Sequence, residues 1–204
     1  IPGGVAFNIA QNLVNLKINP CLLGFLGNDS EGIQLASCCQ NLGINTDYIY
    51  RSDNFSTDNY VAIEDSEGVV AAIADAHSLE SVGSEILKPL KSKHFSSSLK
   101  TNRLPLIVDG NLKSDLLNDL CADSFYQKFD LKLVSASSGK ASRLAPFITK
   151  GNVTLYLNLR EAQILCGINF SDTTSAAIEL ISYGVGKVII TNGQNKVSMA
   201  SKAT

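Results

Sequence analysis

The stretch IPGGVAFNIAQNL, residues 1–13, decides how the rest of this 204-residue chain is interpreted. Two adjacent glycines, Gly3 and Gly4, precede apolar residues that recur at helical spacing. The predicted buried stripe of this helix consists of Val5, Ile9, Leu13 and Leu16. Adjacent glycines let a backbone approach a ligand closely and leave the first helical amides free to donate. Asn8, one turn into the helix, carries donors and acceptors and suits a ligand rich in hydroxyl groups.

The same residues also fit an ordinary buried helix after a tight turn, because short motifs often match by chance. The spacing that follows favours the binding interpretation. Further signature residues come at Gly24, Gly27, Asp29 and Gly32. Together with the pattern Gly-Gly-x-Ala-x-Asn-x-Ala, they resemble the amino-proximal signature of the ribokinase (PfkB) carbohydrate kinase family. The resemblance implies that Gly3, Gly4 and Asn8 contact sugar hydroxyls. The family usually has a small residue, mostly glycine, where Lys17 stands, which bears on the turn after the helix.

This resemblance implies an α/β fold of the ribokinase type, with three layers, a mostly parallel central sheet and a small β lid. We expect residues 1–204 to form one partial domain, with residues 46–75 as the lid insertion. The chain begins at Ile1 instead of a methionine, so we also expect it to have lost its true amino terminus.

Composition supports a globular domain and excludes several function classes. Hydrophobic residues make up 45% of the chain and charged residues 18%, which predicts a sizeable core. The net charge of −2 gives no electrostatic attraction for nucleic acid or an anionic membrane, and no apolar run is long enough to cross a bilayer. The five cysteines form no C-x-x-C pair, so we expect reduced thiols and a cytoplasmic protein. Cys38 and Cys39 are interpreted as core-facing residues of a second helix that Asp29 or Ser30 caps and Gly43 ends.

Two alternating segments, residues 59–64 and 69–74, flank an acidic, glycine-bearing turn and predict a β-hairpin. The pattern alone also fits an edge of any mixed sheet. Its position matches the lid of ribokinase-like proteins, and residues 72–76 resemble the lid return strand of pseudouridine kinases. Such a lid excludes water from phosphoryl transfer. Because lids of this family sometimes pair between subunits, we expect a homodimer through residues 60–74.

Regular α/β alternation favours a parallel sheet covered on both faces. The predicted strands are 20–26, 105–109, 131–134, 153–157 and 187–191. The predicted helices after the lid are 79–90, 114–129, 140–148, 160–166 and 173–183. The polar, serine-rich residues 91–103 are predicted to form a surface loop.

Ligands of open α/β sheets gather at the carboxyl ends of the strands, so the residues after each strand are the site candidates. Asn111 follows one strand in an Asp-x-Asn segment whose asparagine, in the family, can face the substrate. Lys140 lies in a Ser-x-x-Lys-Ala segment that resembles pseudouridine kinases, although a solvated loop explains this lysine equally well.

Asn158 and Glu161 lie three residues apart, on one face of a beginning helix. This pair fits a simple helix cap, and it also suits a carboxylate that holds magnesium-bound waters beside a phosphate. The series resembles the family's Asn-x-x-Glu motif, which implies magnesium at Glu161 and a nucleotide phosphate at Asn158. Thr191 and Gly193 resemble the Ser/Thr-x-Gly step that holds donor phosphates through a hydroxyl and backbone amides.

The catalytic aspartate of the family, in a Gly-Ala-Gly-Asp segment at the start of a late helix, has no counterpart here. We therefore assign no catalytic residue within the chain and expect the base beyond Thr204 in a longer parent. The parent is predicted to transfer a phosphoryl group from ATP, with Mg²⁺, to a hydroxymethyl group of a sugar or nucleoside, first of all pseudouridine. The alternative is a non-catalytic pseudokinase or a sugar-binding remnant.

Overall fold

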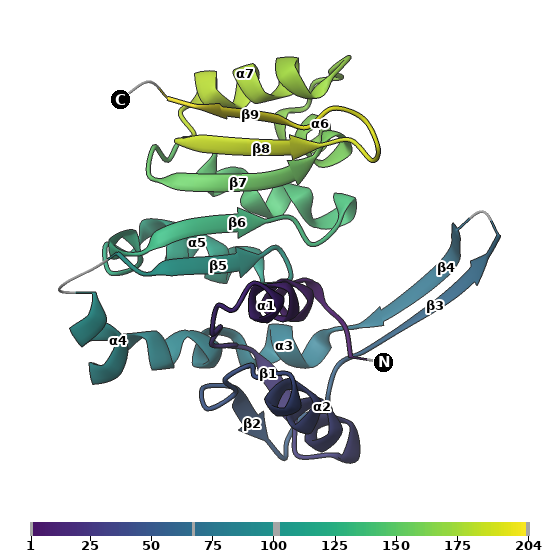
Figure 1. The fold of residues 1–204 in the computed structure, drawn as a ribbon, viewed down its shortest axis with the longest axis vertical. Coiled ribbons are helices and arrows are strands. Elements are labelled where there is room, and N and C mark those ends of the chain that lie inside the picture. The colour runs from purple at the N-terminus through teal and green to yellow at the C-terminus, as the bar shows by residue number, and fades with distance from the viewer. Residues whose placement is uncertain (1, 67, 100–102, 203–204) are drawn as a thin grey trace. The chain divides into compact units, whose positions relative to one another are not determined.

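The structure is a computed structural model that describes residues 2–66, 68–99 and 103–202. The chain divides into two compact units, Ile1–Ser92 and Lys93–Thr204, and each is described here by itself (Figure 1). No described helix is long and apolar enough to cross a membrane.

The first unit begins with α1 (Val5–Asn15), β1 (Phe25–Gly27), α2 (Ser30–Asn41) and β2 (Tyr50–Ser52). β1 and β2 pair in parallel, with Phe25 opposite Tyr50. The strand predicted for residues 20–26 is therefore wrong in its extent, because only Phe25–Gly27 forms a ladder, and Cys21 makes an isolated bridge with Asn45. The cluster that α1 and α2 share consists of Phe7, Ala10, Cys39 and Ile44, with Val14, Leu22 and Leu42 packed against it.

The buried stripe predicted for α1 is also wrong. Phe7 and Ala10 are the buried residues of the helix, whereas Leu16 is 71% exposed. The helix ends at Asn15, so Leu16 lies outside its last turn. The core face runs through Phe7, Ala10 and Val14, at intervals of three and four residues, because this face meets α2.

The two helices end in the same way but with different residues. After α1, the Lys17 amide donates to the Val14 carbonyl at 2.8 Å, and the Ile18 amide donates to the Leu13 carbonyl at 2.9 Å. These two bonds form a Schellman motif, which needs a left-handed residue, and Lys17 has a φ of 61°. After α2 the same position is filled by Gly43, as predicted, with a φ of 82°. The departure from glycine at Lys17 therefore leaves the turn geometry unchanged.

The predicted hairpin is confirmed. β3 (Asn59–Asp65) pairs antiparallel with β4 (Gly68–Asp75), and Figure 1 shows the pair extending away from α3 (His77–Val82). The turn residue 67 lies outside the described residues. The described large apolar side chains of the hairpin are exposed on both of its faces: Tyr60, Val61, Ile63, Val70 and Ile73.

Two predictions for the segment after the hairpin need correction. The helix predicted for residues 79–90 begins earlier, at His77, and changes at Gly83, whose φ of 57° interrupts α3, to the 3-10 helix η1 (Gly83–Lys91). The loop predicted for residues 91–103 is wrong for its middle part, because α4 (Lys93–Ser98) is helical. Residues 100–102 of that prediction lie outside the described residues.

The second unit contains a five-stranded sheet in the order β5-β6-β7-β8-β9. Its strands are β5 (Pro105–Asp109), β6 (Asp130–Val134), β7 (Val153–Asn158), β8 (Lys187–Thr191) and β9 (Ser198–Ser201). The first four run parallel and β9 returns antiparallel to β8. The connecting helices are α5 (Ser114–Ala122), η2 (Tyr126–Lys128), η3 (Ser138–Phe147), α6 (Leu159–Cys166) and α7 (Thr173–Tyr183).

The α/β class and the parallel-dominated sheet are therefore confirmed, and most predicted bounds of this unit agree with the structure. The long helix predicted for residues 114–129 is wrong, since α5 ends at Ala122 and only η2 follows. The helix predicted for 140–148 is the 3-10 segment η3, with Pro146 inside it.

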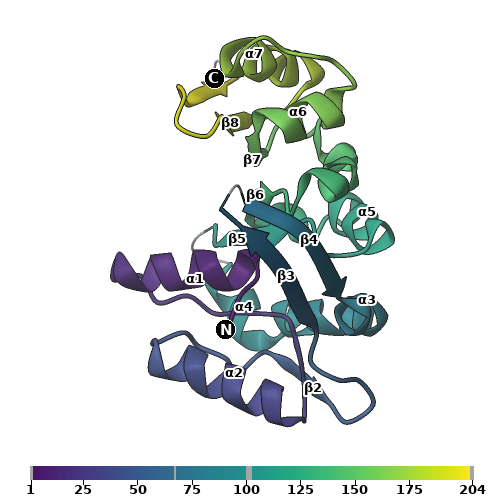
Figure 2. The same ribbon diagram turned by 90° about the vertical axis from the view of Figure 1, so that its right-hand side faces the viewer.

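The helices α5, α6 and α7, which connect strands of this sheet, lie on one of its faces (Figures 1 and 2). Leu131, Leu133 and Leu155 of that face are fully buried. On the opposite face Val134, Tyr156 and Ile189, which are register partners across three strands, are only half-buried.

All five cysteines are free thiols, as expected. Cys39 is buried in the core cluster, as predicted, whereas Cys38 is only half-buried and does not belong to that cluster. Burial raises the pKa of Cys166 to about 11, with a further contribution from the nearby Glu179 carboxylate. This thiol is therefore protonated and unreactive at neutral pH.

Candidate functional site

The predicted site residues of the second unit lie where its parallel strands end. Asp109 is paired with Val134, Val134 with Tyr156, and Asn158 with Thr191, so the four strands finish at one edge of the sheet. The backbone of each strand then turns into a loop or helix, and polar residues cluster there. This edge is the place where ligands of parallel sheets bind.

Asn158 and Glu161 form a complete capping box at the start of α6. The Glu161 amide donates to Asn158 Oδ1 at 2.8 Å, and the Asn158 amide donates to Glu161 Oε2 at 2.8 Å. Glu161 is only 7% exposed, and its negative charge lies at the positive end of the helix dipole. The cap interpretation of the spacing is thus confirmed, and the box holds the carboxylate in one orientation.

A hollow of about 280 Å³ opens beside this box. Its lining combines an apolar floor with a polar rim: Val134, Ser135, Tyr156, Leu157, Asn158, Glu161, Ile189 and Thr191. The floor comes from the half-buried face of the sheet, whereas the rim comes from the residues at the strand ends. Three predicted residues, Asn158, Glu161 and Thr191, therefore share one cavity.

Thr191 and Gly193 follow β8. Thr191 is exposed and lines the hollow, so its hydroxyl is available to a ligand. Gly193 has a φ of 54° in the turn that leads to β9, where the Asn195 amide donates to the Asn192 carbonyl at 2.9 Å. A residue with a side chain is strained in this conformation, so the turn itself favours glycine. Gly193 is next to the hollow in sequence but does not line it.

Asn111 lies at the end of β5 and is held at three atoms. Its amide donates to Asp109 Oδ1 at 2.9 Å, its carbonyl accepts from the Arg143 guanidinium at 3.1 Å, and its side-chain oxygen accepts from Lys140 Nζ at 2.8 Å. The ammonium of Lys140 therefore engages the carboxamide oxygen. The amide nitrogen of the side chain is the donor group of this carboxamide. Lys140 thus contacts a candidate site residue.

The hollow offers an oxygen donor of the kind that magnesium binds. Magnesium prefers oxygen ligands and is usually bound through one or two carboxylates, several waters and the phosphates of a substrate. Glu161 supplies one buried carboxylate, of which Oε2 is already bonded to the Asn158 amide. Among the described residues, no group of three His, Cys, Asp or Glu side chains forms a protein-only metal centre. This donor set fits a magnesium ion that comes with a nucleotide and is held through water.

The other predicted residues, Gly3, Gly4 and Asn8, lie in the first unit at the start of α1. Gly4 has a φ of 103° and precedes a helix that no side chain caps. A side chain added at Gly3 or Gly4 would meet nothing within 4 Å, so the space beside both glycines is open. Asn8 is exposed, and its amide donates to the Gly4 carbonyl at 3.0 Å. An open first turn, two glycines and an exposed carboxamide can together bind hydroxyl groups.

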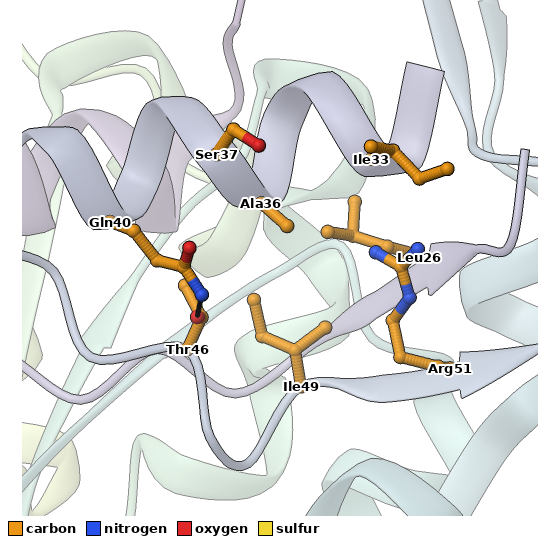
Figure 3. A pocket seen from close by; sticks show the side chains of 8 residues that line it. All are labelled: Leu26, Ile33, Ala36, Ser37, Gln40, Thr46, Ile49 and Arg51. Atoms are coloured by element: carbon orange, nitrogen blue, oxygen red, sulfur yellow. Dashed lines mark hydrogen bonds between the residues drawn. The ribbon is translucent and has the colours of Figure 1, made fainter. Parts of the chain in front are cut away.

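The first unit also contains a hollow, of about 290 Å³, between α2 and β2 (Figure 3). Leu26, Ile33 and Ile49 make it largely apolar, and Gln40 donates to Thr46 across one end. The Arg51 guanidinium at its other end donates to Asn28 Oδ1 at 3.1 Å and to the Gly32 carbonyl at 3.0 Å. The side chains of Gln40, Thr46 and Arg51 are thus engaged within the protein, and no predicted site residue lines this hollow.

Sequence reasoning missed three kinds of site residue. Tyr156 and Ile189 line the hollow, but they resemble any alternating strand residue. Ser135 directly follows β6, at the strand end where ligands of parallel sheets bind, and this position is the signal that could have found it. The bond between Lys140 and Asn111 spans 29 positions, so no local pattern predicts it.

Comparison with known proteins shows the family to which this chain belongs. The whole chain, residues 1–204, matches the model of the pfkB family carbohydrate kinases. The chain is 28% identical to a pseudouridine kinase of Arabidopsis thaliana over 222 aligned positions. That alignment covers 98% of this chain and 57% of the relative, so the chain spans little more than half of the relative's length.

Solved structures agree in fold. A carbohydrate kinase from Agrobacterium tumefaciens superposes with a TM-score of 0.78 at 24% sequence identity. The superposition covers 98% of this chain and 62% of the Agrobacterium chain. Arabidopsis thaliana ribokinase complexed with ribose and ATP superposes with a TM-score of 0.75 at 17% identity, over 98% of this chain and 64% of that one.

Proposed function

Because this chain belongs to the pfkB family of carbohydrate kinases, we propose that the protein transfers the γ-phosphoryl group of ATP to a hydroxymethyl group of a sugar or nucleoside. The relative of known activity is a pseudouridine kinase, which makes pseudouridine the first candidate acceptor and another ribosyl compound the second. The single observation that carries the proposal is the capping box of Asn158 and Glu161, which fixes a buried carboxylate at the wall of the strand-end hollow.

In this proposal, the residues divide into a donor group and an acceptor group. Thr191 and Gly193 bind the phosphates of ATP through a hydroxyl and backbone amides, and Asn158 orients the same phosphates. Glu161 would hold magnesium through water, and the bound ion would supply charge neutralisation to the transferred phosphoryl group. Catalysis then depends on positioning and on charge stabilisation.

The acceptor-binding residues of the first unit are Gly3, Gly4 and Asn8, which bind hydroxyl groups. In the second unit Asn111 is assigned to acceptor binding, with its side-chain oxygen held by Lys140 and its side-chain nitrogen as the donor. A ligand at this point must present an oxygen, such as a hydroxyl or a carbonyl. The described residues are thus assigned to binding, and none of them is assigned as the base that deprotonates the acceptor hydroxyl.

Binding and transfer are tested together by titration calorimetry with Mg·ATP, pseudouridine and ribose, followed by an assay for the phosphorylated product. The informative variant is Glu161→Gln, because glutamine can complete a capping box and preserves the fold. We expect Glu161→Gln to weaken Mg·ATP binding about tenfold, since it removes the charge that attracts the hydrated ion. Pseudouridine binding should stay unchanged.

Asp115→Asn is the matched control. Asp115 is an exposed carboxylate in the first turn of α5, outside the hollow. The kinase proposal fails if the wild-type chain binds neither Mg·ATP nor any acceptor. It also fails if Glu161→Gln and Asp115→Asn bind Mg·ATP equally well.

We further propose that the hairpin of β3 and β4 is a lid and that it also pairs two copies of the chain. Val61 and Ile73 are cross-strand partners on one face, and Tyr60 and Ala74 are partners on the other. Both faces thus expose apolar groups, so one can close over an acceptor while the other contacts a second copy. Sedimentation velocity of the wild-type chain and of a Tyr60→Lys variant distinguishes a dimer from a monomer. The free thiols support a cytoplasmic location.

A further inference from the structure

The described large apolar side chains of the hairpin of β3 and β4 pack too little to fix its orientation. Val61 is 59% exposed and Ile73 is 73% exposed, although both are large and apolar. A hairpin that packs so little would swing freely if its two ends were ordinary loops. The connections at its base must therefore determine where it points, and these connections lie wholly within the first unit.

The first connection is Thr57, two residues before β3. Thr57 is 5% exposed, and each of its polar groups except the carbonyl is bonded to the start of α2 or the end of β1. Its hydroxyl donates to Asp29 Oδ1 at 2.6 Å, and its amide donates to Asp29 Oδ2 at 2.6 Å. The hydroxyl also accepts from the Gly27 amide at 3.0 Å. The chain that enters the hairpin is thus held on both carboxylate oxygens of one side chain.

Asp29 is itself immobilised. It is the N-cap of α2, and its Oδ1 accepts from the Gly32 amide at 2.8 Å. The hydrogen bonds from Thr57, with that from Gly32, hold the pKa of this carboxyl below its usual range, so the group is ionised at neutral pH. Gly32 is fixed from its other end as well, because its carbonyl accepts from the Arg51 guanidinium at 3.0 Å.

The two glycines beside Asp29 are required by this packing. A Cβ on Gly27 would lie 2.7 Å from Asp29 Oδ2 and 2.7 Å from the Phe55 carbonyl oxygen. A Cβ on Gly32 would collide with the Gly27 carbonyl oxygen and lie 2.7 Å from Thr57 Oγ1. Any side chain at either glycine would therefore displace Asp29, Thr57 or the backbone beside them.

The second connection is Asp58, the next residue of the chain. Its Oδ1 accepts from the Ser78 amide at 3.0 Å and its Oδ2 accepts from the Leu79 amide at 3.1 Å. These amides belong to the first turn of α3, which follows β4 directly and has no cap from its own N-cap residue, Ala76. The strand that leaves the hairpin is therefore tied to the residue that enters it.

From this geometry we propose that Asp29, Thr57 and Asp58 form a clasp that sets the orientation of the hairpin, and that Asp29 and Asp58 are positioning residues for lid closure. The hairpin pivots as one body about residues 57–58, and the clasp restricts that pivot. The part of the proposal that concerns closure rests on the proposed lid function. The part that concerns orientation depends on the geometry alone.

The orientation of the hairpin is measured by double electron–electron resonance, which gives the distance between two genetically encoded spin-label residues. One replaces the exposed Ser66 at the hairpin tip and the other the exposed Gln34 on α2, so both labels lie in the first unit. In the otherwise wild-type chain we expect one narrow distance distribution. Thr57→Val keeps the shape of the side chain but removes both hydroxyl bonds, and the distribution should become at least about twofold broader.

Four further variants complete the test. Thr57→Ser restores a hydroxyl and should restore the narrow distribution, which a general loss of stability would not do. Asp58→Asn removes the charge at the other connection and should broaden the distribution too. Asp47→Asn replaces an exposed carboxylate of the same unit outside the clasp and should change nothing. Asp29→Asn could unfold α2 by weakening its cap. Thr57→Val still tests the clasp in that case, because it leaves the hydrogen bond between Asp29 and the Gly32 amide intact.

The effect of the clasp on acceptor binding is measured separately, by titration calorimetry with pseudouridine. If the lid closes over the acceptor, Thr57→Val should weaken its binding about tenfold while Mg·ATP binding stays the same, because a freer lid is closed less of the time. A distance distribution that is equally narrow in Thr57→Val and in the wild-type chain overturns the clasp. An absence of acceptor binding in the wild-type chain instead counts against the proposed function and leaves the distance result valid.

Discussion

The two units of this chain are stabilised in different ways. In the second unit, the five-stranded sheet packs one face against helices through side chains such as Leu131, Leu133 and Leu155, which have no exposed surface. In the first unit the strands are three residues long outside the hairpin, and the elements meet at hydrogen-bonded junctions centred on Asp29 and Asp58. Of the twelve largest fully buried side chains among the described residues, only Ile44 and Leu90 belong to the first unit.

This difference fits the work proposed for each unit. A rigid packed sheet can hold the Asn158–Glu161 box and Thr191 in fixed positions, which phosphate binding requires. A hairpin that must open and close is better held by a few bonds at its base, because these restrict its motion without burying its faces. The comparison therefore predicts that the second unit responds most to lost packing and the first unit to altered junctions.

The largest effect is expected for Leu155→Ala in β7. Leu155 is completely buried in the centre of the sheet, so its truncation leaves a cavity and should lower the free energy of unfolding by about 3–4 kcal/mol. The control is Ile189→Ala on the half-buried face of β8, which should cost about 1 kcal/mol because less apolar surface is lost there. Denaturant unfolding followed by circular dichroism measures both. Equal losses for the two variants would contradict the assignment of the core to one face.

The next effect tests the junctions of the first unit. Gly32→Ala introduces a Cβ against the Gly27 carbonyl and Thr57 Oγ1, and it should cost about 2–3 kcal/mol because neither neighbour can move. Gly24→Ala is the matched control, since its Cβ would meet nothing within 4 Å and should change stability by less than about 0.5 kcal/mol. The same unfolding measurement applies. If Gly32→Ala leaves the free energy of unfolding unchanged, the residues around Gly32 can move apart, and the junction is not rigid enough to hold the base of the hairpin.

The same contrast explains how much of the fold could be predicted from the sequence. In the second unit the helix 173–183 and the strands 105–109 and 187–191 were predicted with the observed bounds, because the apolar periodicity of each segment favours one kind of element. In the first unit the signals conflict. The stripe of α1 admits two faces, and only contact with α2 selects Phe7 and Ala10.

The candidate site shows the same limit. The spacing of Asn158 and Glu161 is local, so the sequence reveals the pair and its two possible roles. The bonds between Lys140 and Asn111 and between Thr57 and Asp29 each join residues almost 30 positions apart. They depend on strand register and on the base of the hairpin, which no local pattern specifies.

The smallest expected effect concerns the helix ends of the first unit. The turn after α1 makes both of its hydrogen bonds, but the backbone of Lys17 is strained. Lys17 and Gly43 occupy equivalent positions in two Schellman motifs, but only glycine adopts a positive φ without steric cost. Lys17→Gly should therefore raise the free energy of unfolding by about 0.5–1 kcal/mol, the left-handed penalty less the entropy that glycine adds to the unfolded chain. Gly43→Lys should lower it by a similar amount, and the double exchange should be nearly neutral. If Lys17→Gly is instead destabilising, the lysine side chain contributes a contact that outweighs its backbone strain, and the turn after α1 is held by more than its two hydrogen bonds.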